Sequence, residues 1–279
     1  MKLVLIIRGL SMEKKIAVDE KKCVHCGLCV KDCMSYALQM SALKMPEYTE
    51  NGVDRCLACQ HCMSICPTGA LSFGGLKPEN SEPVGYGDSE ELLRLIKSRR
   101  SVRDYKDADI PAEKIYKIKE MLAYPPTGGN EDCLRFSIVG TRTKMDEIRK
   151  VSYDKILESS NFTPIYKFLR DIFNSGEDII YRGASSMVVV CVNEEKVVPG
   201  CETKDPVIAL SYLELYAQSL GLGTLWNDLA VKIINQVPEV ARLLQIPENY
   251  TIGYAMLLGI PDVKYKRTVQ KETRNVTIL

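Results

Sequence analysis

The arrangement of the cysteines constrains this chain more than any other feature. Eight of its eleven cysteines form two tetrads with the same spacing, C-x-x-C-x-x-C-x-x-x-C, and proline follows the second tetrad directly. The tetrads are Cys23, Cys26, Cys29 and Cys33, and Cys56, Cys59, Cys62 and Cys66. Three thiolates within seven residues can surround one face of a cubic iron–sulfur cluster, while the fourth cysteine of each tetrad ligates the other cluster. The sequence therefore predicts two [4Fe–4S] clusters.

The same spacing predicts how the ligands divide between the clusters. One cluster takes Cys23, Cys26, Cys29 and Cys66, and the other takes Cys56, Cys59, Cys62 and Cys33. A disulfide framework would require an oxidising compartment, and zinc sites are usually built from paired C-x-x-C halves, so both alternatives are less favoured. The only histidines, His25 and His61, stand at x positions of these runs and are expected to be spacers.

Charge and hydropathy argue against two classes of function. The chain has 279 residues, enough for two domains, and a formal net charge of +1. Neither part of it has the basic excess that is typical of a nucleic-acid-binding protein. No apolar run approaches the length of a membrane span. The apolar stretch of residues 3–7 is too short for a secretory signal, because Arg8 ends it.

The compartment is indicated by the remaining cysteines, Cys133, Cys191 and Cys201, which have no evident pairing in the sequence. Unpaired thiols and oxygen-sensitive clusters fit a reducing environment, so we expect a cytoplasmic protein. Met12 competes with Met1 as the true start, because the cysteine-rich pattern begins just after it.

The repeat and the turn residues predict the domain organisation. The tetrads are offset by 33 residues, from Cys23 to Cys56, as in a duplicated half-domain. Short strands are expected before and after the cluster loops, at residues 16–18 and 70–73. A proline- and glycine-containing stretch then separates this part from the rest. The expected divisions are a cluster-binding domain at residues 12–75, a linker at 76–88 and a larger domain at 89–279.

Hydrophobic periodicity predicts a mixture of helices and strands in the larger domain. A first helix is expected to begin near Ser89, as its N-cap, and to end in a basic run. A second begins at Pro111 and reaches about Leu122. Residues 205–220 predict a long helix that must be buried nearly all round, inside the domain or against a partner. Further helices are expected at residues 143–157, 164–173 and 238–244, and strands at 135–139, 186–192, 224–226 and 251–259, before an irregular tail.

Three stretches of the larger domain carry candidate binding chemistry. Residues 99–103, Arg-Arg-Ser-Val-Arg, offer guanidinium groups and a hydroxyl that suit a phosphate monoester, although cations at a helix C-terminus also favour the helix dipole. Residues 126–130, Pro-Thr-Gly-Gly-Asn, form a loop whose backbone can approach a ligand closely. Residues 221–226, Gly-Leu-Gly-Thr-Leu-Trp, follow the long helix, where an ordinary glycine C-cap is the alternative interpretation.

In this order the three stretches resemble the FMN-dependent nitroreductase family, whose signatures include an Arg-Arg-Ser-x-Arg run, a Pro-Ser/Thr-x-x-Asn loop and a Gly-Leu-Gly-Thr turn. The resemblance covers about residues 89–279. Residues 14–75 resemble the bacterial two-cluster ferredoxins, with Met34 in place of the proline that often follows the fourth cysteine. The whole chain is therefore similar to a ferredoxin–nitroreductase fusion.

The resemblance implies an α+β fold throughout. A small ferredoxin-like α+β domain would be followed by a nitroreductase-type α+β domain, with an antiparallel sheet flanked by helices. It also implies a homodimer with FMN at the interface, in which the C-terminal strand reaches across to the partner's sheet. The tail after Pro261, which has no evident core of its own, fits that exchange.

The resemblance also implies the flavin-binding residues. Arg99, Arg100, Ser101 and Arg103 would hold the phosphate and ribityl end of FMN, and Gly221, Leu222 and Gly223 would lie against the isoalloxazine with backbone donors near N5. The partner subunit would supply Pro126, Thr127, Gly128 and Asn130. A late basic residue usually reaches the phosphate in this family. Lys266, Arg267 and Lys271 are the candidates for that role, and Arg267 is the residue expected to bind the phosphate.

The loop departs from the family pattern after Asn130. Much of the family continues Asn-x-Gln-Pro-Trp-x-Phe, and of this only Phe136 is retained here. Because that region shapes the pocket over the flavin, nitroaromatic substrates do not follow from the resemblance. Cys133 in the altered stretch is either a thiol near the flavin or a small filler residue. The flavin domain contains no histidine, and no dedicated catalytic acid is assigned.

The function implied is reduction of an electron-poor organic acceptor, such as a nitro, quinone or activated alkene group. The two clusters would relay electrons between FMN and an external donor, either a ferredoxin-type protein or NAD(P)H as co-substrate. Neither a nucleic acid nor a membrane is an expected partner. The alternative is an electron-transfer or redox-sensing iron–sulfur flavoprotein without small-molecule turnover. A flavin-modifying or dehalogenating branch of the same superfamily is a third interpretation.

Overall fold

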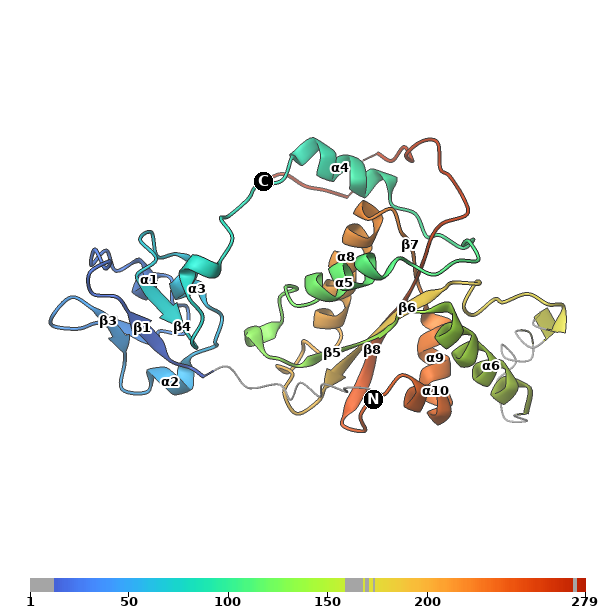
Figure 1. Cartoon of the computed structure of the whole chain (residues 1–279), viewed down its shortest axis with the longest axis horizontal. Helices are drawn as coiled ribbons and strands as arrows, with labels where there is room; N and C mark the ends of the chain where they lie inside the picture. Colours follow the sequence, from blue (N-terminus) through green and yellow to red (C-terminus); the bar gives the residue numbers. More distant parts are fainter. Residues whose placement is uncertain (1–12, 159–167, 169–170, 173, 273–274) are drawn as a thin grey trace. The chain divides into compact units, whose positions relative to one another are not determined.

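The computed structural model describes residues 13–158, 168, 171–172, 174–272 and 275–279. The chain divides into two compact units, Met1–Tyr86 and Gly87–Leu279. Each unit is considered by itself, and Figure 1 labels the elements of both. The expected helix at residues 164–173 lies almost wholly outside the described residues.

The first unit is built from very short elements. Its strands form two antiparallel pairs, β1 with β4 and β2 with β3. One-turn helices carry the third cysteine of each tetrad. The elements are β1 (Ile16–Val18), α1 (Leu28–Lys31), β2 (Leu38–Met40), β3 (Pro46–Tyr48), α2 (Gly52–Arg55), α3 (His61–Ser64), β4 (Leu71–Phe73) and the 3-10 turn η1 (Pro78–Asn80).

The buried core of this unit is small. Its cluster of buried hydrophobic residues consists of Met63, Leu71 and Phe73, and tetrad cysteines pack against it. A core of this size contributes little stability alone, so small domains of this kind depend on metals or cross-links. The two strands that were expected at residues 16–18 and 70–73 are confirmed, and Ile16 pairs with Phe73.

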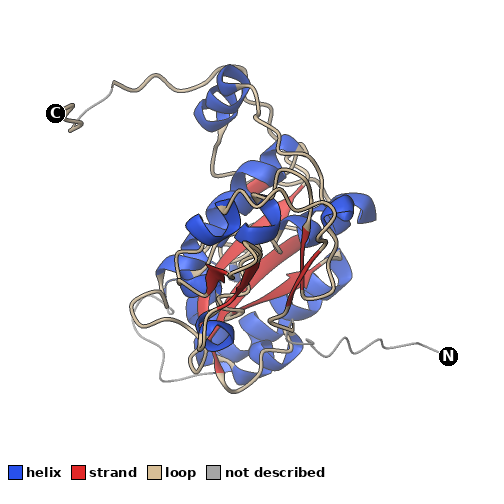
Figure 2. Cartoon of the chain, turned by 90° about the vertical axis from the view of Figure 1, so that its left-hand side faces the viewer, coloured by secondary structure: helices blue, strands red, loops and turns tan. Residues whose placement is uncertain are grey.

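The second unit contains a four-stranded antiparallel sheet in the order β5-β6-β8-β7. Helices surround it, as the colouring by secondary structure makes clear (Figure 2). The elements are α4 (Ser89–Ser98), α5 (Ala112–Met121), the 3-10 turn η2 (Gly128–Asn130), β5 (Leu134–Val139), α6 (Arg142–Glu158), β6 (Ser186–Asn193), α8 (Lys204–Ser219), β7 (Gly223–Trp226), α9 (Asp228–Gln236), α10 (Pro238–Leu243) and β8 (Tyr250–Gly259).

The sheet lies between two layers of helices (Figure 1). Every residue of β6 is buried, and alternate side chains enter different cores. Val188 and Val190 pack with Leu210 and Leu213 of α8. The intervening residues of β6 pack against the other layer, formed by α6, α9 and α10. This period of two on a sheet covered on both faces explains why the strand is apolar throughout.

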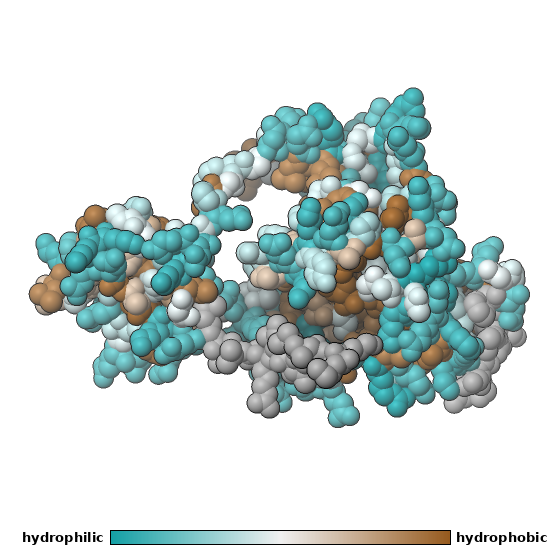
Figure 3. All heavy atoms as spheres, in the orientation of Figure 1, coloured by the Kyte–Doolittle hydropathy of each residue, from teal (hydrophilic) through white to brown (hydrophobic). Residues whose placement is uncertain are grey.

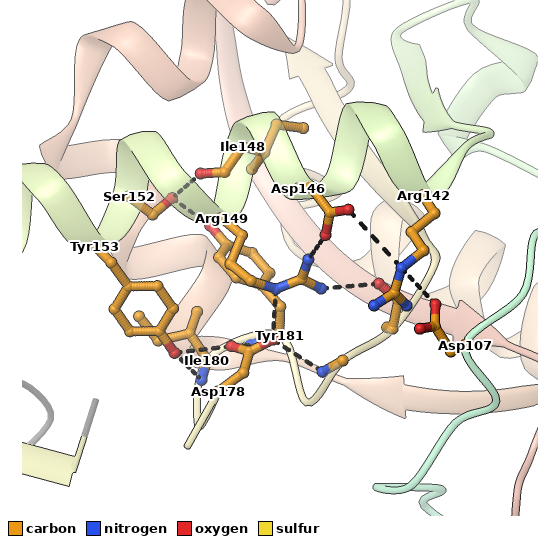
Figure 4. A network of polar contacts seen from close by, with 12 residues as sticks. Asp107, Arg142, Asp146, Ile148, Arg149, Ser152, Tyr153, Asp178, Ile180 and Tyr181 are labelled. Atoms are coloured by element: carbon orange, nitrogen blue, oxygen red, sulfur yellow. Dashed lines mark hydrogen bonds and ion pairs between the residues drawn. The ribbon is translucent and has the colours of Figure 1, made fainter. Parts of the chain in front are cut away.

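A polar network fixes the segment before β6 against α6 (Figure 4). The Asp178 carboxylate accepts a hydrogen bond from Arg149 Nε at 2.7 Å and one from the Tyr153 hydroxyl at 2.8 Å. Backbone amides of Tyr181 and Gly183 also donate to this carboxylate. The network satisfies a loop that would otherwise bury unpaired backbone groups, and it thereby anchors the entry to the central strand.

Most of the expected elements of the second unit are confirmed, with three differences. The N-cap of α4 is Asp88, not Ser89, because the Asp88 carboxylate accepts from the Glu91 amide at 2.8 Å. Helix α9 was not expected, because its short amphipathic run directly follows β7. Helix α8 is not buried all round inside the single chain, since Val207 and Tyr212 are 42% and 50% exposed, which leaves the expected alternative of burial against a partner.

Candidate iron–sulfur and flavin sites

The folded first unit groups the eight tetrad cysteines crosswise around two cavities. The first cavity is lined by Cys23, Cys26, Cys29 and Cys66. The second cavity is lined by Cys33, Cys56, Cys59 and Cys62. These are the two ligand sets that the spacing predicts. The other residues that line the first cavity are largely apolar, whereas Ser35, Tyr48, Gln60 and His61 add polar groups to the lining of the second.

The two cysteine loops share an unusual backbone. Gly27 and Gln60, which precede α1 and α3, have φ values of 71° and 62°. His25 and Ala58, at matching positions, also have positive φ. This left-handed conformation turns successive cysteines towards one cavity, and it requires no histidine, because alanine stands at the matching position. The environment of His25 therefore fits a spacer residue. Its Nδ1 forms a hydrogen bond with the Lys44 carbonyl oxygen at 3.0 Å.

The fourth cysteine of each tetrad lies in a hydrogen-bonding environment that favours a thiolate. Burial opposes ionisation of Cys66, but the Ala70 amide, 3.2 Å from its sulfur, and other donors bring its pKa below the ordinary value. Burial likewise opposes ionisation of Cys33, and the Ser35 hydroxyl with backbone amides lowers its pKa overall. Thiolates are the form that ligates iron.

The third cysteines behave in the opposite way. Burial is the main cause that raises the pKa of Cys62 to about 12, and burial also raises that of Cys29. Such thiols stay protonated unless a cation compensates the charge, as a bound metal does. In the described part of the chain, no three His, Cys, Asp or Glu side chains are close enough to hold a single metal ion. Sulfur atoms spread around a cavity suit a multi-iron cluster better than one ion.

In the second unit, two of the three candidate flavin stretches meet. Ser101 forms a parallel bridge with Thr224 of β7, and the Val102 amide donates to the Thr224 carbonyl at 2.9 Å. A side chain at Gly223 would meet Val102 at 2.8 Å, so glycine allows this approach. The fold therefore places the Arg-Arg-Ser-Val-Arg run beside the Gly221–Leu222–Gly223 turn, although 117 residues lie between them in the chain.

The arginines of this run face different partners. Arg99 Nη1 bonds to the Glu214 carboxylate of α8 at 3.0 Å, and Glu214 is nearly buried. Arg103 Nη1 donates to the Ser101 carbonyl. Arg100 donates to the carbonyl groups of Lys97 and Arg99, while its Nη2 is buried without a hydrogen-bond partner in the described part of the chain. A buried donor of this kind indicates a place for an external acceptor.

An open groove of about 1110 Å³ adjoins these arginines. It is bounded by the end of α4 and by the C-terminal tail. Lys271 lines the groove, together with Arg99 and Arg100, whereas Arg267 is exposed and does not line it. Of the three late basic residues, Lys271 is therefore the one that the structure brings to the phosphate-binding candidates.

Lys114 supports the Gly221–Leu222–Gly223 turn. Its Nζ donates to the Leu220 carbonyl at 2.6 Å, at the end of α8. Gly221 then takes a φ of 73°, the left-handed conformation that commonly ends a helix. A cation at a helix C-terminus also stabilises the helix dipole. Lys114 therefore fixes the position of a turn whose backbone groups are candidate flavin contacts.

The third stretch, residues 126–130, lies at the other end of α8. The Gly128 amide donates to Asp205 Oδ2 at 3.0 Å, in the first turn of that helix. A side chain at Gly128 would meet the Cys201 sulfur at 2.6 Å. Since α8 has 16 residues, it is about 24 Å long. Within one chain, Pro126, Thr127, Gly128 and Asn130 are therefore not brought to the other candidate residues.

Cys133 lies at the same end of α8. It is fully buried, and its thiol donates to Asp205 Oδ2 at 3.7 Å. Burial, followed by the Asp205 charge, raises the pKa of Cys133 to about 11. The side chain is thus a protonated thiol enclosed by protein. This environment fits a small filler residue better than a thiol near the flavin.

Sequence reasoning missed three polar residues that organise this region: Lys114, Asp205 and Glu214. The two acids belong to a largely apolar helix, and both are buried. Burying an unpaired carboxylate costs free energy, so each acid indicated that a partner from elsewhere in the fold must bind it. Nothing in the sequence pattern identified those partners.

Comparison with known proteins decides the family. Residues 96–260 match the description of the nitroreductase family, and residues 14–70 match that of the 4Fe-4S dicluster domain. The chain belongs to the nitroreductase family. It is accordingly an oxidoreductase, extended at its N-terminal end by a ferredoxin-type domain.

Individual relatives of this nitroreductase-family chain agree. A provisionally named NADH dehydrogenase/NAD(P)H nitroreductase of Methanothermobacter thermautotrophicus is 28% identical over 171 residues, which is 61% of this chain and 78% of that protein. A crystal structure of a nitroreductase with bound FMN from Bacteroides fragilis superimposes with a TM-score of 0.56 at 27% identity, covering 68% of this chain and 98% of that one. A ferredoxin of Methanocaldococcus jannaschii is 31% identical over 71 residues, 25% of this chain and 92% of that protein.

A search of the described residues finds no helix with both the length and the apolar character needed to cross a membrane.

Proposed function

We propose that this chain is a homodimeric, FMN-dependent oxidoreductase that reduces an electron-poor organic acceptor. Its eight tetrad cysteines would hold two [4Fe–4S] clusters for electron relay between an external donor and FMN. The observation that carries the proposal is that one chain contains two kinds of site. The first unit has two crosswise cysteine cavities, and in the second unit the Arg-Arg-Ser-Val-Arg run lies beside the Gly-Leu-Gly turn. Eight cysteines proposed as cluster ligands and three further cysteines without a disulfide agree with a reducing, cytoplasmic setting.

The groove beside α4 supports a site for the FMN phosphate. Arg99, Arg100 and Lys271 line it, and Arg100 Nη2 has the unused donor capacity that a phosphate oxygen would satisfy. Ser101 and Arg103 extend this polar surface towards β7. Arg267 remains a candidate from the flanking tail, but the lining of the groove favours Lys271.

The turn after α8 supports a site for the isoalloxazine. Leu222 is buried, while the left-handed Gly221 and the closely packed Gly223 give the backbone a fixed shape without side chains in the way. Lys114 holds the preceding carbonyl in place. Rigid backbone donors at this turn would orient the flavin and polarise it. When bound, FMN exchanges one or two electrons, so it can join one-electron carriers to a two-electron acceptor.

The second half of the site would come from the partner subunit. In the single chain, Val207, Ile208 and Tyr212 form an exposed apolar stripe on one face of α8. An isologous contact that pairs two copies of α8 in antiparallel orientation would cover this stripe. It would also bring the partner's residues 126–130, held at the start of its α8, to this chain's Gly221–Leu222–Gly223 turn at the end of α8.

Apolar surface along α4 would be part of the same interface (Figure 3). Leu92, Leu93 and Ile96 are each more than two-fifths exposed in the single chain. Amphipathic helices of soluble proteins normally bury such a face, so a partner is expected to cover it. The exchange of a C-terminal strand remains part of the proposal, since the described residues beyond Gly259 form no strand within this chain.

The proposal is tested by the composition and assembly of protein purified without oxygen. It predicts iron and labile sulfide for two [4Fe–4S] clusters per chain, one FMN per chain and a dimer in sedimentation equilibrium. Turnover with nitro, quinone and activated-alkene acceptors then separates the enzyme from a carrier. A protein with clusters and FMN that reduces none of these acceptors would support the electron-transfer alternative. A protein that binds no FMN would overturn the proposal.

A further inference from the structure

The two cysteine cavities are matched in most respects. Each is lined by one histidine and by four cysteines in the crosswise arrangement. Each fourth cysteine has a hydroxyl two residues further on, Ser35 at 3.5 Å from the Cys33 sulfur and Thr68 at 3.8 Å from the Cys66 sulfur. These features follow from the internal repeat, so they do not distinguish one cavity from the other.

Tyr48 breaks this symmetry. Its hydroxyl donates to the sulfur of Cys56 across 3.8 Å, and it lines only the second cavity. The residues contributed to the first cavity from outside its cysteine loops include Val18, Met40 and Pro46, which have no hydroxyl. The second cavity therefore has two side-chain hydroxyls directed at ligand sulfurs, from Ser35 and Tyr48, whereas the first has one, from Thr68.

The position of the Tyr48 ring is held by its surroundings. Tyr48 ends β3 and pairs with Leu38 of β2. A side chain at Gly52 would meet the Tyr48 ring at 3.0 Å and the Ala37 carbonyl oxygen at 2.2 Å. Gly52 is thus required for the close packing of α2 against the β2–β3 hairpin. The hydroxyl consequently has little freedom to leave Cys56, which is the condition for a lasting electrostatic effect.

We propose that Tyr48 makes the two clusters electrochemically unequal, by raising the reduction potential of the cluster held by Cys33, Cys56, Cys59 and Cys62. This inference rests on the proposed function, since it presumes both clusters. The reason is that a hydrogen bond to a ligand sulfur stabilises the more negative, reduced state over the oxidised state. An electron that reaches the ferredoxin-type unit would then reside mainly on the cluster of the second cavity.

The test is a potentiometric titration of the anaerobic, full-length holoprotein, followed by electron paramagnetic resonance, with wild type and Tyr48→Phe compared. Phenylalanine keeps the ring in place and removes only the donor. We expect a three- to tenfold fall in the equilibrium constant for reducing one cluster, or about 30 to 60 mV for a one-electron couple. The potential of the other cluster should stay unchanged, so that the two values converge.

Two further variants identify which cluster responds. Ser35→Ala should shift the same signal as Tyr48→Phe, because Cys33 and Cys56 line one cavity, and Thr68→Ala should shift the other signal. Tyr36→Phe is the matched control, since Tyr36 is 75% exposed and does not line either cavity. It should leave both potentials as they are.

Two outcomes would overturn the inference while leaving the proposed function intact. One is a Tyr48→Phe protein with two full clusters and unchanged potentials. The other is a shift in the signal that Thr68→Ala moves. Iron and sulfide analysis separates these outcomes from failure of the proposed function, because wild-type protein with fewer than two [4Fe–4S] clusters would contradict the proposed function itself.

Discussion

The cysteine cavities of the first unit and the candidate flavin site of the second are assembled over very different distances along the chain. All eight tetrad cysteines come from the stretch between Cys23 and Cys66, and one-turn helices and left-handed loop residues place them. The candidate flavin residues extend from Arg99 to Lys271, and part of the set lies at the far end of α8. Local spacing is thus sufficient to predict the first kind of site, whereas the second depends on packing and, in the proposed dimer, on a second chain.

The largest effect is expected where the site is most local. Cys59→Ala should lose one cluster completely and retain FMN, because the cavity loses a ligand that no other residue replaces. Cys33→Ala should remove the same paramagnetic signal as Cys59→Ala, and Cys26→Ala should remove the other one. If Cys59→Ala protein keeps two intact clusters, the crosswise assignment is wrong.

The proposed dependence of the flavin site on a second chain can be tested at α8. Tyr212→Asp places a charge in the exposed apolar stripe, so it should convert the dimer to monomers, which would lose FMN while keeping both clusters. Sedimentation and flavin absorbance measure the two effects. Tyr116→Asp, at a 69% exposed position on α5, is the control and should change neither. Monomers with FMN still tightly bound would contradict the shared site.

Removing one phosphate-binding candidate should weaken FMN binding without abolishing it. Arg103→Ala is expected to weaken FMN binding by about 10- to 100-fold, the usual loss for a hydrogen bond to a charged group, with cluster content unchanged. Titration of flavin-depleted protein with FMN gives the dissociation constant. Arg94→Ala is the matched control, because Arg94 on α4 is exposed and pairs only with Glu91 in the described residues. Equal affinities in all three proteins would remove Arg103 from the site.

The network around Asp178 tests whether the second unit owes its stability to its own core. Asp178→Asn should lower the free energy of unfolding by about 3 kcal/mol, because Arg149 would lose its partly buried partner. The single tryptophan, Trp226, reports unfolding of this unit. Asp154→Asn, which breaks an exposed pair with Lys150, should change the free energy by less than about 1 kcal/mol. Loss of clusters on Asp178→Asn would show that the units do not fold separately.

The smallest effect is expected at alkaline pH. Burial raises the pKa of Cys133 to about 11, so above the ordinary thiol pKa the unfolded chain loses this proton first. The unfolded state then binds fewer protons than the folded state, and stability falls as pH rises from about 9 to 11, by at most about 1.4 kcal/mol per pH unit for one thiol. Cys133→Ala should flatten this slope in denaturation curves followed at Trp226. An unchanged slope would show that Cys133 ionises freely in the folded chain.

The difference between the units also explains what the sequence could predict. Patterns that act over a few residues were sufficient to predict which cysteines line each cavity, the strands β1 and β4, and β6, whose unbroken apolar run matches a strand covered on both faces. The N-cap at Asp88 was misplaced by one residue, because Asp88 and Ser89 are both good capping residues. Glu214, Asp205, Lys114 and Tyr48 could not be assigned, since their partners lie elsewhere in the fold.

The central claim, that clusters and flavin belong to one electron path, is tested most directly by an anaerobic titration that follows flavin and cluster absorbance together. NADH, NADPH and a reduced low-potential ferredoxin are added separately. The account predicts that at least one donor reduces both chromophores to a common equilibrium, and that Cys59→Ala slows entry from ferredoxin. Complete reduction of the flavin with clusters that stay oxidised, or the reverse, would contradict it.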